Sequence, residues 1–435
     1  MASGKAAGKQ EVVLVTRAEC VEIVSQTLNL DKVRVVDYAI EAASDEILGF
    51  LGEYFRLAIT IAEDSGERKL YYFLKALPTD KDQRELLERI GLFHKEVQLY
   101  SILLPKLKWN TGSSKWRPNC YLSRYDLLIM EELGHLGFGH VPDRMEFTRK
   151  HMQETLKCVA RMHAASLEFE INHCENTRID AIFGSLLFES QISGTNPWFK
   201  AGLNVVKVFA ERMSKFKDHA IVRDGDKLMD MMEKVYEFQY STRDYQNVLC
   251  HRDLWSKNIM FQFPKRHGSD EWDYDNPQHC LFMDFQICRY QPPAVDVLLT
   301  IFFNTRRKHR DEHFEEYLKF YHDFLRDELK KYGIDAGVKL PWAEFRQSCT
   351  HYALLPLVFN CVYAPLTHLT PGILVQLQKS DPEKYHRVCN AERNDFVLEN
   401  MHLDAFYHDY VTEVMEELLQ HLCSGHMAER TAIIP

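Results

Sequence analysis

Early in the chain, apolar and β-branched residues gather in three short runs. These runs cover residues 33–43, 54–63 and 68–77, and a polar turn at residues 64–67 separates the last two. Runs of this composition bounded by turn residues are typical of β-strands. The pattern predicts a small antiparallel meander of three strands.

After these runs, the spacing of apolar residues becomes that of a helix. Leu86, Ile90, Phe93, Val97 and Tyr100 recur at spacings of three and four residues. Such spacing places them on one face of a helix, so a single helix is predicted across this segment.

A further apolar strand, at residues 127–130, leads through Glu131, Glu132 and Leu133 into a glycine-rich turn at residues 134–139. We place the boundary between two lobes there. The predicted domains are a tail with a leading helix over residues 1–30, a first lobe with its hinge over 31–133 and a second lobe over 134–435.

Beyond this boundary the pattern is mostly helical. Met152, Leu156, Val159 and His163 make one helical stripe, and residues 353–366 are an apolar run, too short to span a bilayer, that predicts a buried helix. Short apolar strands are predicted at residues 247–250, 259–263 and 280–283, with an exposed hairpin at 265–278. The fold class is therefore α+β, with a small β-rich lobe and a larger, mainly helical one.

Composition narrows the class of protein. The 435 residues are 46% hydrophobic and 27% charged, as in soluble globular proteins, and the net charge of −10 argues against nucleic acid or an anionic membrane as partner. The first ten residues show no apolar stretch of a signal peptide, and the eleven cysteines include no CxxC pair. We expect a cytoplasmic protein with reduced thiols and no obligate protein partner.

The strongest chemical signal is the segment His-Arg-Asp-Leu-Trp-Ser-Lys-Asn at residues 251–258, between two predicted strands. Twenty-six residues after Asn258, a third strand delivers Asp284, followed by Phe and Gln. Phosphoryl transfer needs this set, because Asp253 can face the attacking hydroxyl while Asn258 and Asp284 hold Mg²⁺ against the triphosphate of ATP. Each residue alone could simply cap a turn; the joint spacing favours the catalytic interpretation.

Lys75 lies at the end of the third strand, and Glu96 falls on the apolar stripe of the helix that follows. A carboxylate on a buried face is costly unless it is paired. We expect Lys75 to be that partner and to direct its ammonium group at the phosphates. The alternative is a solvated lysine and a carboxylate at a helix edge in water.

Two further nucleotide contacts are predicted from position. Gly49 and Gly52 stand between the first two strands, where a loop that covers the phosphates is required, although two glycines in a turn need no phosphate to explain them. Backbone groups of Glu131, Glu132 and Leu133 are expected to bind adenine, with the side chains in solvent.

Two other polar residues have more ordinary interpretations. His163 is expected to be a packed helix histidine rather than a catalyst. Asp296 opens an apolar helix, so it is interpreted as an acid at a helix start, with bracing of the catalytic loop as the alternative.

At these residues the chain resembles the CHK kinase-like, or ecdysteroid kinase-like, family, whose relatives include choline and aminoglycoside kinases. The resemblance covers residues 41–303. It rests on HRDLWSKNIMF at 251–261, MDFQ at 283–286, PAVDVL at 293–298, LKALP at 74–78, FHKEVQLY at 93–100, MEEL at 130–133 and VARMHAAS at 159–166.

The resemblance implies a bilobal protein-kinase-like fold and transfer of phosphate from ATP to an alcohol, with ecdysteroids as acceptors for some members. It assigns Asp253 as catalytic base, Asn258 and Asp284 as metal ligands, and Lys75 and Glu96 as the phosphate-orienting pair. The glycine loop departs from the family pattern, since it lacks the serine that relatives often carry.

A small acceptor molecule is favoured over a protein. Only twelve residues separate Asp284 from Asp296, with no A-P-E element between them, so there is no room for a protein-kinase activation segment. The acceptor pocket should then come from the C-terminal helices, where residues 352–366 suit a lipophilic alcohol or simply form helix core.

Two other functions remain open. A choline- or amine-type kinase would need acids or an aromatic cage around a cation, which the sequence does not locate. A pseudokinase would keep the fold as a binding module, but it would have no need for a base and both metal ligands together.

Overall fold

The computed structural model describes residues 14–42, 52–78, 81–108, 110–111, 114–175 and 177–424. Contacts divide the chain into two compact units. The first contains the residues up to Phe93 together with Asn119–Glu132, and the second contains His94–Pro118 and the chain from Leu133 onward. The segment His94–Pro118, which we expected in the first lobe, therefore packs with the second unit.

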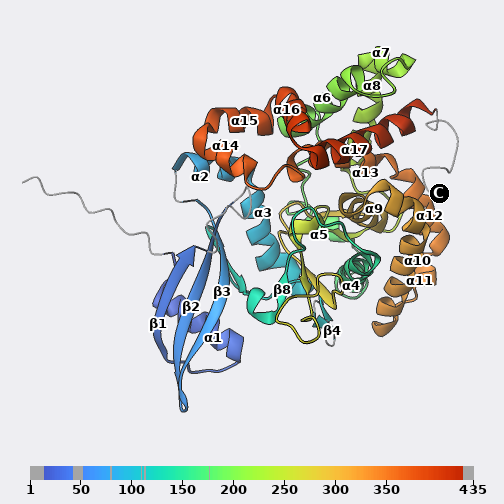
Figure 1. Cartoon of the computed structure of the whole chain (residues 1–435). Coiled ribbons are helices and arrows are strands. Elements are labelled where there is room, and N and C mark those ends of the chain that lie inside the picture. Colours follow the sequence, from blue (N-terminus) through green and yellow to red (C-terminus); the bar gives the residue numbers. More distant parts are fainter. Residues whose placement is uncertain are drawn as a thin grey trace, which may run out of the picture. The chain divides into compact units, whose positions relative to one another are not determined.

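A five-stranded antiparallel sheet in the order β1-β2-β3-β7-β6 forms the first unit (Figure 1). Its elements are α1 (Arg17–Leu28), β1 (Val35–Ala42), β2 (Glu53–Glu63), β3 (Gly66–Ala76), α2 (Lys81–Ile90), β6 (Cys120–Arg124) and β7 (Leu127–Glu131). Strands β1, β2 and β3 form the predicted meander. The sequence interpretation missed β6, whose five residues are all half-buried and show no alternation.

Helix α1 completes the core of this unit. It begins at a capping box, in which Thr16 Oγ1 accepts from the Glu19 amide at 3.2 Å and the Glu19 carboxylate accepts from the Thr16 amide at 2.7 Å. Its buried residues Cys20, Ile23 and Val24 pack in one cluster with alternate residues of β2 and β3. The leading helix is thus part of the sheet unit.

The single helix predicted through residues 86–100 is wrong. Helix α2 ends at Ile90, Gly91 takes a φ of +77°, and α3 (Leu92–Gln98) begins directly afterwards. A positive φ is open to glycine at little cost, and it turns the chain between the two helices. Phe93, Val97 and Tyr100 are buried, as the stripe predicts, whereas Ile90 at the end of α2 is 42% exposed.

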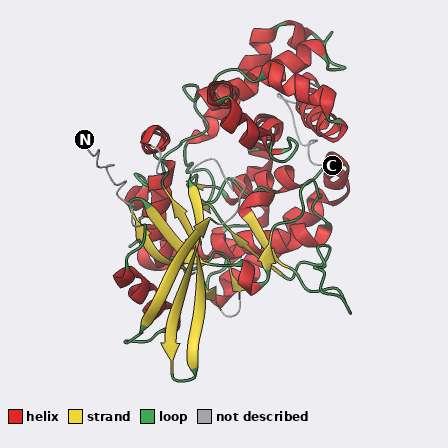
Figure 2. Ribbon diagram, turned by 60° about the vertical axis from the view of Figure 1, so that its left-hand side comes forward, coloured by secondary structure: helices red, strands yellow, loops and turns green. Residues whose placement is uncertain are grey.

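The second unit is mostly helical (Figure 2). Its longer helices are α4 (Arg149–His173), α6 (Pro197–Arg212), α8 (Gly225–Glu233), α9 (Pro293–Asn304), α10 (Arg307–Lys331), α12 (Trp342–His351), α13 (Leu354–Thr367), α14 (Ile373–Ser380), α15 (Pro382–Asn390), α16 (Asn394–Leu403) and α17 (Ala405–Cys423). Shorter helices are α5 (Ile179–Phe183), α7 (Ala220–Arg223) and α11 (Ala336–Lys339). Every residue of α9 is buried, and α13 is the buried helix expected at residues 353–366.

Short strands in this unit carry the predicted chemical motif. They are β4 (Asn110–Thr111), β5 (Ser114–Lys115), β8 (Phe138–Gly139), β9 (Val248–Cys250), β10 (Ile259–Gln262), β11 (His279–Phe282) and β12 (Arg289–Gln291). Strand β10 pairs with both β8 and β11, and β9 pairs with β12. The α+β class, with a β-rich smaller unit and a mainly helical larger one, is confirmed.

Aromatic packing explains why the segment His94–Pro118 belongs to the second unit. Trp116 is 1% exposed, and its carbonyl accepts from the Phe282 amide at 3.0 Å. The rings of Trp116 and Tyr100 both meet Phe285 edge to face, with centroids 5.8 and 5.7 Å apart. The segment therefore packs directly beside the predicted metal ligand Asp284.

Among the described residues, no single helix is long and apolar enough to cross a membrane; only α12 and α13 taken together, across a bend of 51°, reach the required length and composition. All eleven cysteines lie within the described residues and are free thiols.

Candidate active site

The structure brings Asp253 and Asn258 into direct contact. They lie in the loop between β9 and β10, and each is 7% exposed. The Asn258 side-chain amide donates to the Asp253 carbonyl at 2.8 Å and to its carboxylate Oδ2 at 2.9 Å. This contact fixes the carboxylate and orients the amide oxygen of Asn258 away from it.

His251 joins this loop to the segment that carries Asp284. Its Nδ1 accepts from the Asp253 amide at 3.3 Å, so Nε2 holds the proton and donates to the Met283 carbonyl at 2.9 Å. Burial lowers the pKa of His251, which keeps the ring neutral. The Met283 amide in turn donates to the Asn258 carbonyl at 2.9 Å. The predicted base and both predicted metal ligands therefore lie on segments that hydrogen bonds join.

Backbone strain marks the same two segments. Arg252 and Asp284 have φ values of +69° and +63°, in the left-handed region that residues with a side chain rarely occupy. Each such residue costs roughly 1–3 kcal/mol, and it persists only where its surroundings impose it. Both positions belong to the predicted site, because Arg252 precedes Asp253 and Asp284 is itself a predicted ligand.

Asp296 braces the catalytic loop rather than its own helix. The carboxylate at the start of α9 accepts from the His251 and Arg252 amides, both at 2.6 Å. Asp296 stands in the first turn of α9, as expected, and its carboxylate also makes the bracing contact that was the alternative interpretation. Two charge-assisted bonds to adjacent amides hold the turn that presents Asp253.

His163 is a packed histidine, as expected, but it also belongs to this brace. It is fully buried on α4, with Nε2 3.1 Å from Asp296 Oδ2 and Nδ1 2.7 Å from the Tyr321 hydroxyl. It lies one residue further from the reacting atoms than Asp296, so it acts through that carboxylate.

Glu96 is fully buried, as its position on the apolar stripe predicts. Its carboxylate Oε1 accepts from the Phe285 amide at 3.1 Å, which ties α3 to the residue after Asp284. Lys75, 3% exposed on β3, belongs to the other unit, so its pairing with Glu96 stays a prediction.

Gly52 lies against Lys75 within the first unit. A Cβ at Gly52 would stand 3.1 Å from the Ala76 carbonyl oxygen and 3.4 Å from Lys75 Cγ, so a larger residue would press on the lysine stem. Gly49, the other predicted loop glycine, lies outside the described residues. Of the loop that was expected to cover the phosphates, the structure therefore describes only the end at Gly52.

The three residues expected at the adenine site lie where β7 ends. The Glu131 carboxylate accepts from the Asn119 amide at 3.1 Å, and Glu132 lies 3.7 Å from Arg56. Leu133 is buried, and its carbonyl accepts from the amides of Leu136 and Phe138. The two glutamate side chains and the Leu133 carbonyl thus contact neighbouring groups of the protein. Adenine binding by the backbone of these three residues stays a prediction.

A buried carboxylate that the sequence interpretation missed contacts the loop. Glu189 lies 2.6 Å from the guanidinium of Arg252, which is 1% exposed, and 3.7 Å from Arg289. Its Oε1 also accepts from the amides of Ser190, Gln191 and Ile192. Burial alone would raise the pKa of Glu189, but the two arginines and the amides outweigh it and lower the pKa.

Lys95 is a second missed residue beside this cluster. It is 1% exposed on α3, donates to the Phe188 carbonyl at 2.8 Å and lies over the Phe188 ring. Burial lowers the pKa of Lys95 to about 7. Neither Lys95 nor Glu189 carries a sequence signal, because their partners lie far away along the chain.

A predicted carboxylate base, an amide and a second carboxylate joined by hydrogen bonds, in a chain that also carries a five-stranded unit with a strand lysine, are typical of kinase-like phosphotransferases. The chain has this protein-kinase-like fold. It belongs to the ecdysteroid kinase-like family, whose model matches residues 48–334, so the resemblance seen in its motifs is confirmed.

Two solved structures are similar to this chain at low sequence identity. An ethanolamine kinase from Plasmodium vivax matches with 14% identity and a TM-score of 0.35, covering 75% of this chain and 81% of that one. An ADP-bound aminoglycoside phosphotransferase matches with 13% identity and a TM-score of 0.31, covering 80% of this chain and 97% of that one. No curated protein sequence matches.

Proposed function

We propose that this chain transfers the terminal phosphoryl group of ATP to a hydroxyl of a small molecule. The contact between Asp253 and the Asn258 amide carries the proposal, because it fixes a carboxylate and an amide oxygen side by side. Family membership supports the same chemistry. An ecdysteroid is one acceptor to test, and a cytoplasmic location, which fits the free thiols, is part of the proposal.

The donor atoms fit Mg²⁺. The Asn258 amide nitrogen is committed to Asp253, which leaves the amide oxygen for a cation, and Asp284 supplies a carboxylate. Both are hard oxygen donors, of which Mg²⁺ typically takes one or two from protein. When bound, the ion would neutralise charge on the triphosphate.

In the proposed reaction the Asp253 carboxylate accepts the proton of the acceptor hydroxyl. The hydroxyl oxygen forms a bond to the terminal phosphorus as the bond from that phosphorus to the bridging oxygen breaks, and ADP leaves. His251 and Asp296 keep the loop in place during this exchange through the bonds described above.

A thermal-shift measurement tests the proposal. The purified chain should unfold at a higher temperature with ATP and Mg²⁺ than with ATP alone, since ligand at a hundredfold excess over Kd stabilises by about 2.7 kcal/mol. Asp284→Asn should lose the Mg²⁺-dependent part. No shift at millimolar ATP, together with no ADP formation, would contradict the kinase and favour a pseudokinase.

A further inference from the structure

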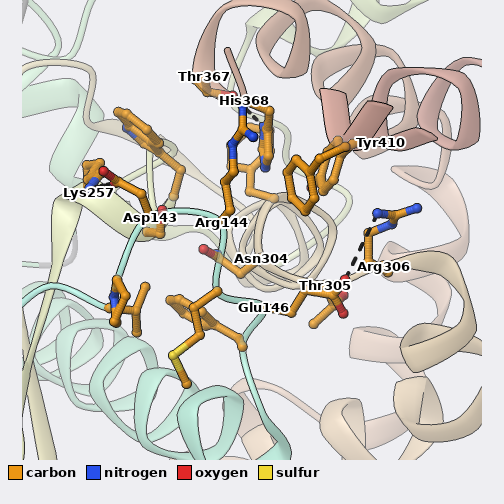
Figure 3. A pocket seen from close by; sticks show the side chains of 18 of the residues that line it. Asp143, Arg144, Glu146, Lys257, Asn304, Thr305, Arg306, Thr367, His368 and Tyr410 are labelled. Atoms are coloured by element: carbon orange, nitrogen blue, oxygen red, sulfur yellow. Dashed lines mark hydrogen bonds and ion pairs between the residues drawn. The ribbon is translucent and has the colours of Figure 1, made fainter. Parts of the chain in front are cut away.

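A pocket in the second unit lies directly beside the catalytic loop (Figure 3). The loop residues Trp255 and Lys257 form one side of it. Its other lining residues come from residues 141–147, the end of α9, the segment after α13 and the start of α17. Residues of the catalytic loop therefore form part of the wall of this pocket.

The ion pairs around this pocket hold the loop only weakly. Asp143 pairs with Lys257 of the loop, and their side chains are 48% and 39% exposed. Arg144, the next residue in the wall, pairs with Asp404 just before α17 and does not contact the loop. An ion pair in contact with water contributes little, because the solvent screens its charges. The position of the loop therefore depends mainly on its buried contacts.

Asn304, the last residue of α9, makes such a buried contact from the wall of the pocket. Figure 3 shows its side chain among those of the wall, and the residue is 7% exposed. Its side-chain nitrogen donates to the Leu254 carbonyl at 2.6 Å and to the Thr300 carbonyl, one helical turn earlier, at 2.8 Å. Both protons of this nitrogen are thus used, and one of them fixes the residue directly after Asp253.

Three polar residues recur at a spacing of four along α9. They are Asp296, Thr300 and Asn304, on a helix that is otherwise apolar and buried at every residue. This spacing places the three side chains along one side of the helix. The residues at the two ends of the stripe contact the catalytic loop, since Asp296 binds two loop amides and Asn304 binds the Leu254 carbonyl. A buried polar side chain is costly unless it is paired, and the loop supplies the partners.

The contacts of α9 lie on both sides of Asp253. Asp296 holds the two amides before it, and Asn304 holds the residue after it. Between these contacts, Arg252 has the strained φ of +69°, which persists only where the surroundings impose it. A strained segment that is held at one end only can relax by moving its other end. The second contact therefore keeps the segment, and with it Asp253, in place.

We propose that Asn304 is a positioning residue for Asp253 and acts through the Leu254 carbonyl. The inference rests on the proposed function, because it assigns the residue that fixes the proposed base. The effect is on turnover rather than on nucleotide binding. Asn258, the predicted metal ligand in the same loop, is held separately, since its carbonyl accepts from the Met283 amide at 2.9 Å.

The first test is hydrogen exchange of the full chain carrying Asn304→Leu, measured by mass spectrometry. Leucine branches at the same atom as asparagine but has no donor, so the Leu254 carbonyl loses its bond while the site stays filled. Exchange of peptides that cover residues 250–258 should be about tenfold faster than in the wild-type chain, as expected for one lost hydrogen bond. Peptides of α6 should keep their wild-type rates. Asn304→Ala should change the loop in the same direction.

The second test is turnover per nucleotide-binding site. ADP formed from ATP and Mg²⁺ is measured with water or ecdysone as acceptor, and binding sites are counted by calorimetric titration with ATP and Mg²⁺. In Asn304→Leu, kcat per site should fall about tenfold while the KM for ATP stays within about threefold. A merely structural role would instead lower the number of binding sites and leave kcat per site unchanged.

Asn400→Leu is the matched control. Asn400 on α16 is 8% exposed, and its side chain donates to the Phe396 carbonyl four residues earlier at 2.8 Å, as Asn304 does to Thr300. This variant should leave loop exchange and kcat per site within about twofold, since it shares no partner with the loop. Equal changes in both leucine variants would overturn the proposal. Wild-type exchange of residues 250–258 in Asn304→Leu and Asn304→Ala would overturn it as well.

Hydrogen exchange is measured without nucleotide, so it separates this inference from the proposed function. Faster loop exchange in Asn304→Leu, with no ADP formed by the wild-type chain, would contradict the kinase and keep Asn304 as the residue that fixes the loop. ADP formation at the wild-type kcat by a variant whose loop exchanges faster would do the reverse, because the base would then not depend on Asn304.

Discussion

The catalytic loop and the pocket beside it are both attached to α9, but they are held in different ways. At the start of α9, Asp296 binds two loop amides, and at its end Asn304 binds the Leu254 carbonyl. The loop is buried, and Asp253 is held by Asn258, five residues away in the same motif. The pocket instead has exposed ion pairs from segments far apart in the chain. The residues predicted to carry the chemistry thus lie close together in the chain, whereas the residues around the pocket come from distant segments.

The largest effect is expected from replacing Asp253, the proposed base in the catalytic loop. Asp253→Asn should lower kcat by roughly 10²–10⁴-fold, the range for loss of a general base, because an amide cannot take the acceptor proton. Binding of Mg²⁺ and ATP should persist, as thermal shift would show. Asp270→Asn, on the exposed segment between β10 and β11, is the control and should keep wild-type turnover. Full activity of Asp253→Asn would remove the proposed role.

The second-largest effect is expected from replacing Asp296, which braces the catalytic loop. Asp296→Asn places an amide nitrogen against one of two amide donors and leaves His163 without its carboxylate. A hydrogen bond to a charged group contributes about 1.5–3 kcal/mol, and Asp296 accepts two of them from the loop, so we expect a destabilisation of at least that order by urea unfolding together with reduced kcat. A variant as stable as wild type would show that the loop does not depend on this carboxylate.

Glu189→Gln should have a moderate effect. It removes the charge beside Arg252 but keeps an oxygen for the three amides, and a hydrogen bond between charged groups contributes about 1.5–3 kcal/mol. Because the pKa of Glu189 is lowered on folding, its contribution is present above the unfolded pKa of about 4.3 and is lost as pH falls through the lower folded value.

Urea unfolding at several pH values checks this expectation. The difference between wild type and Glu189→Gln should be full near neutral pH and shrink below about pH 4. Glu237→Gln, an exposed residue, serves as the control and should show no such pH dependence. A constant difference at all pH values would mean that charge at Glu189 is unimportant.

The last prediction concerns Lys95, whose effect is a dependence of stability on pH. Its pKa falls to about 7 on folding, so between that value and the unfolded pKa of about 10.4 the unfolded chain binds one more proton. Stability should therefore rise with pH across this range, by at most about 1.4 kcal/mol per pH unit. Lys95→Met should flatten the rise in urea unfolding, and an unchanged slope would contradict the titration.

Sequence patterns predicted much of the fold because local periodicity records burial. The meander, the buried α13 and the strands around the catalytic loop follow from it. The break at Gly91 was missed because the apolar stripe runs through it unchanged, and β6 was missed because it lies half-buried along its whole length.

The candidate site also contains residues that the sequence predicts and residues that it does not. Asp253, Asn258 and Asp284 could be predicted as a set because their spacing matches the pattern that phosphoryl transfer requires. Asn304 and Glu189 were not, because each meets the loop only through folding across 50 and 63 residues of chain. No spacing rule connects such partners. Both contacts arise only in the folded chain, so a pattern of residue types along the sequence does not record them.

The division of the chain has a consequence for its synthesis. The sheet unit takes Leu127 and Ile129 of β7 into its core, yet His94–Pro118, which belongs to the other unit, is made first. The nascent sheet therefore stays incomplete until residue 131 has left the ribosome, and a fragment that stops at Phe93 would expose the apolar side of β3. Neither unit is one continuous stretch of chain, so neither can be obtained by a single cut.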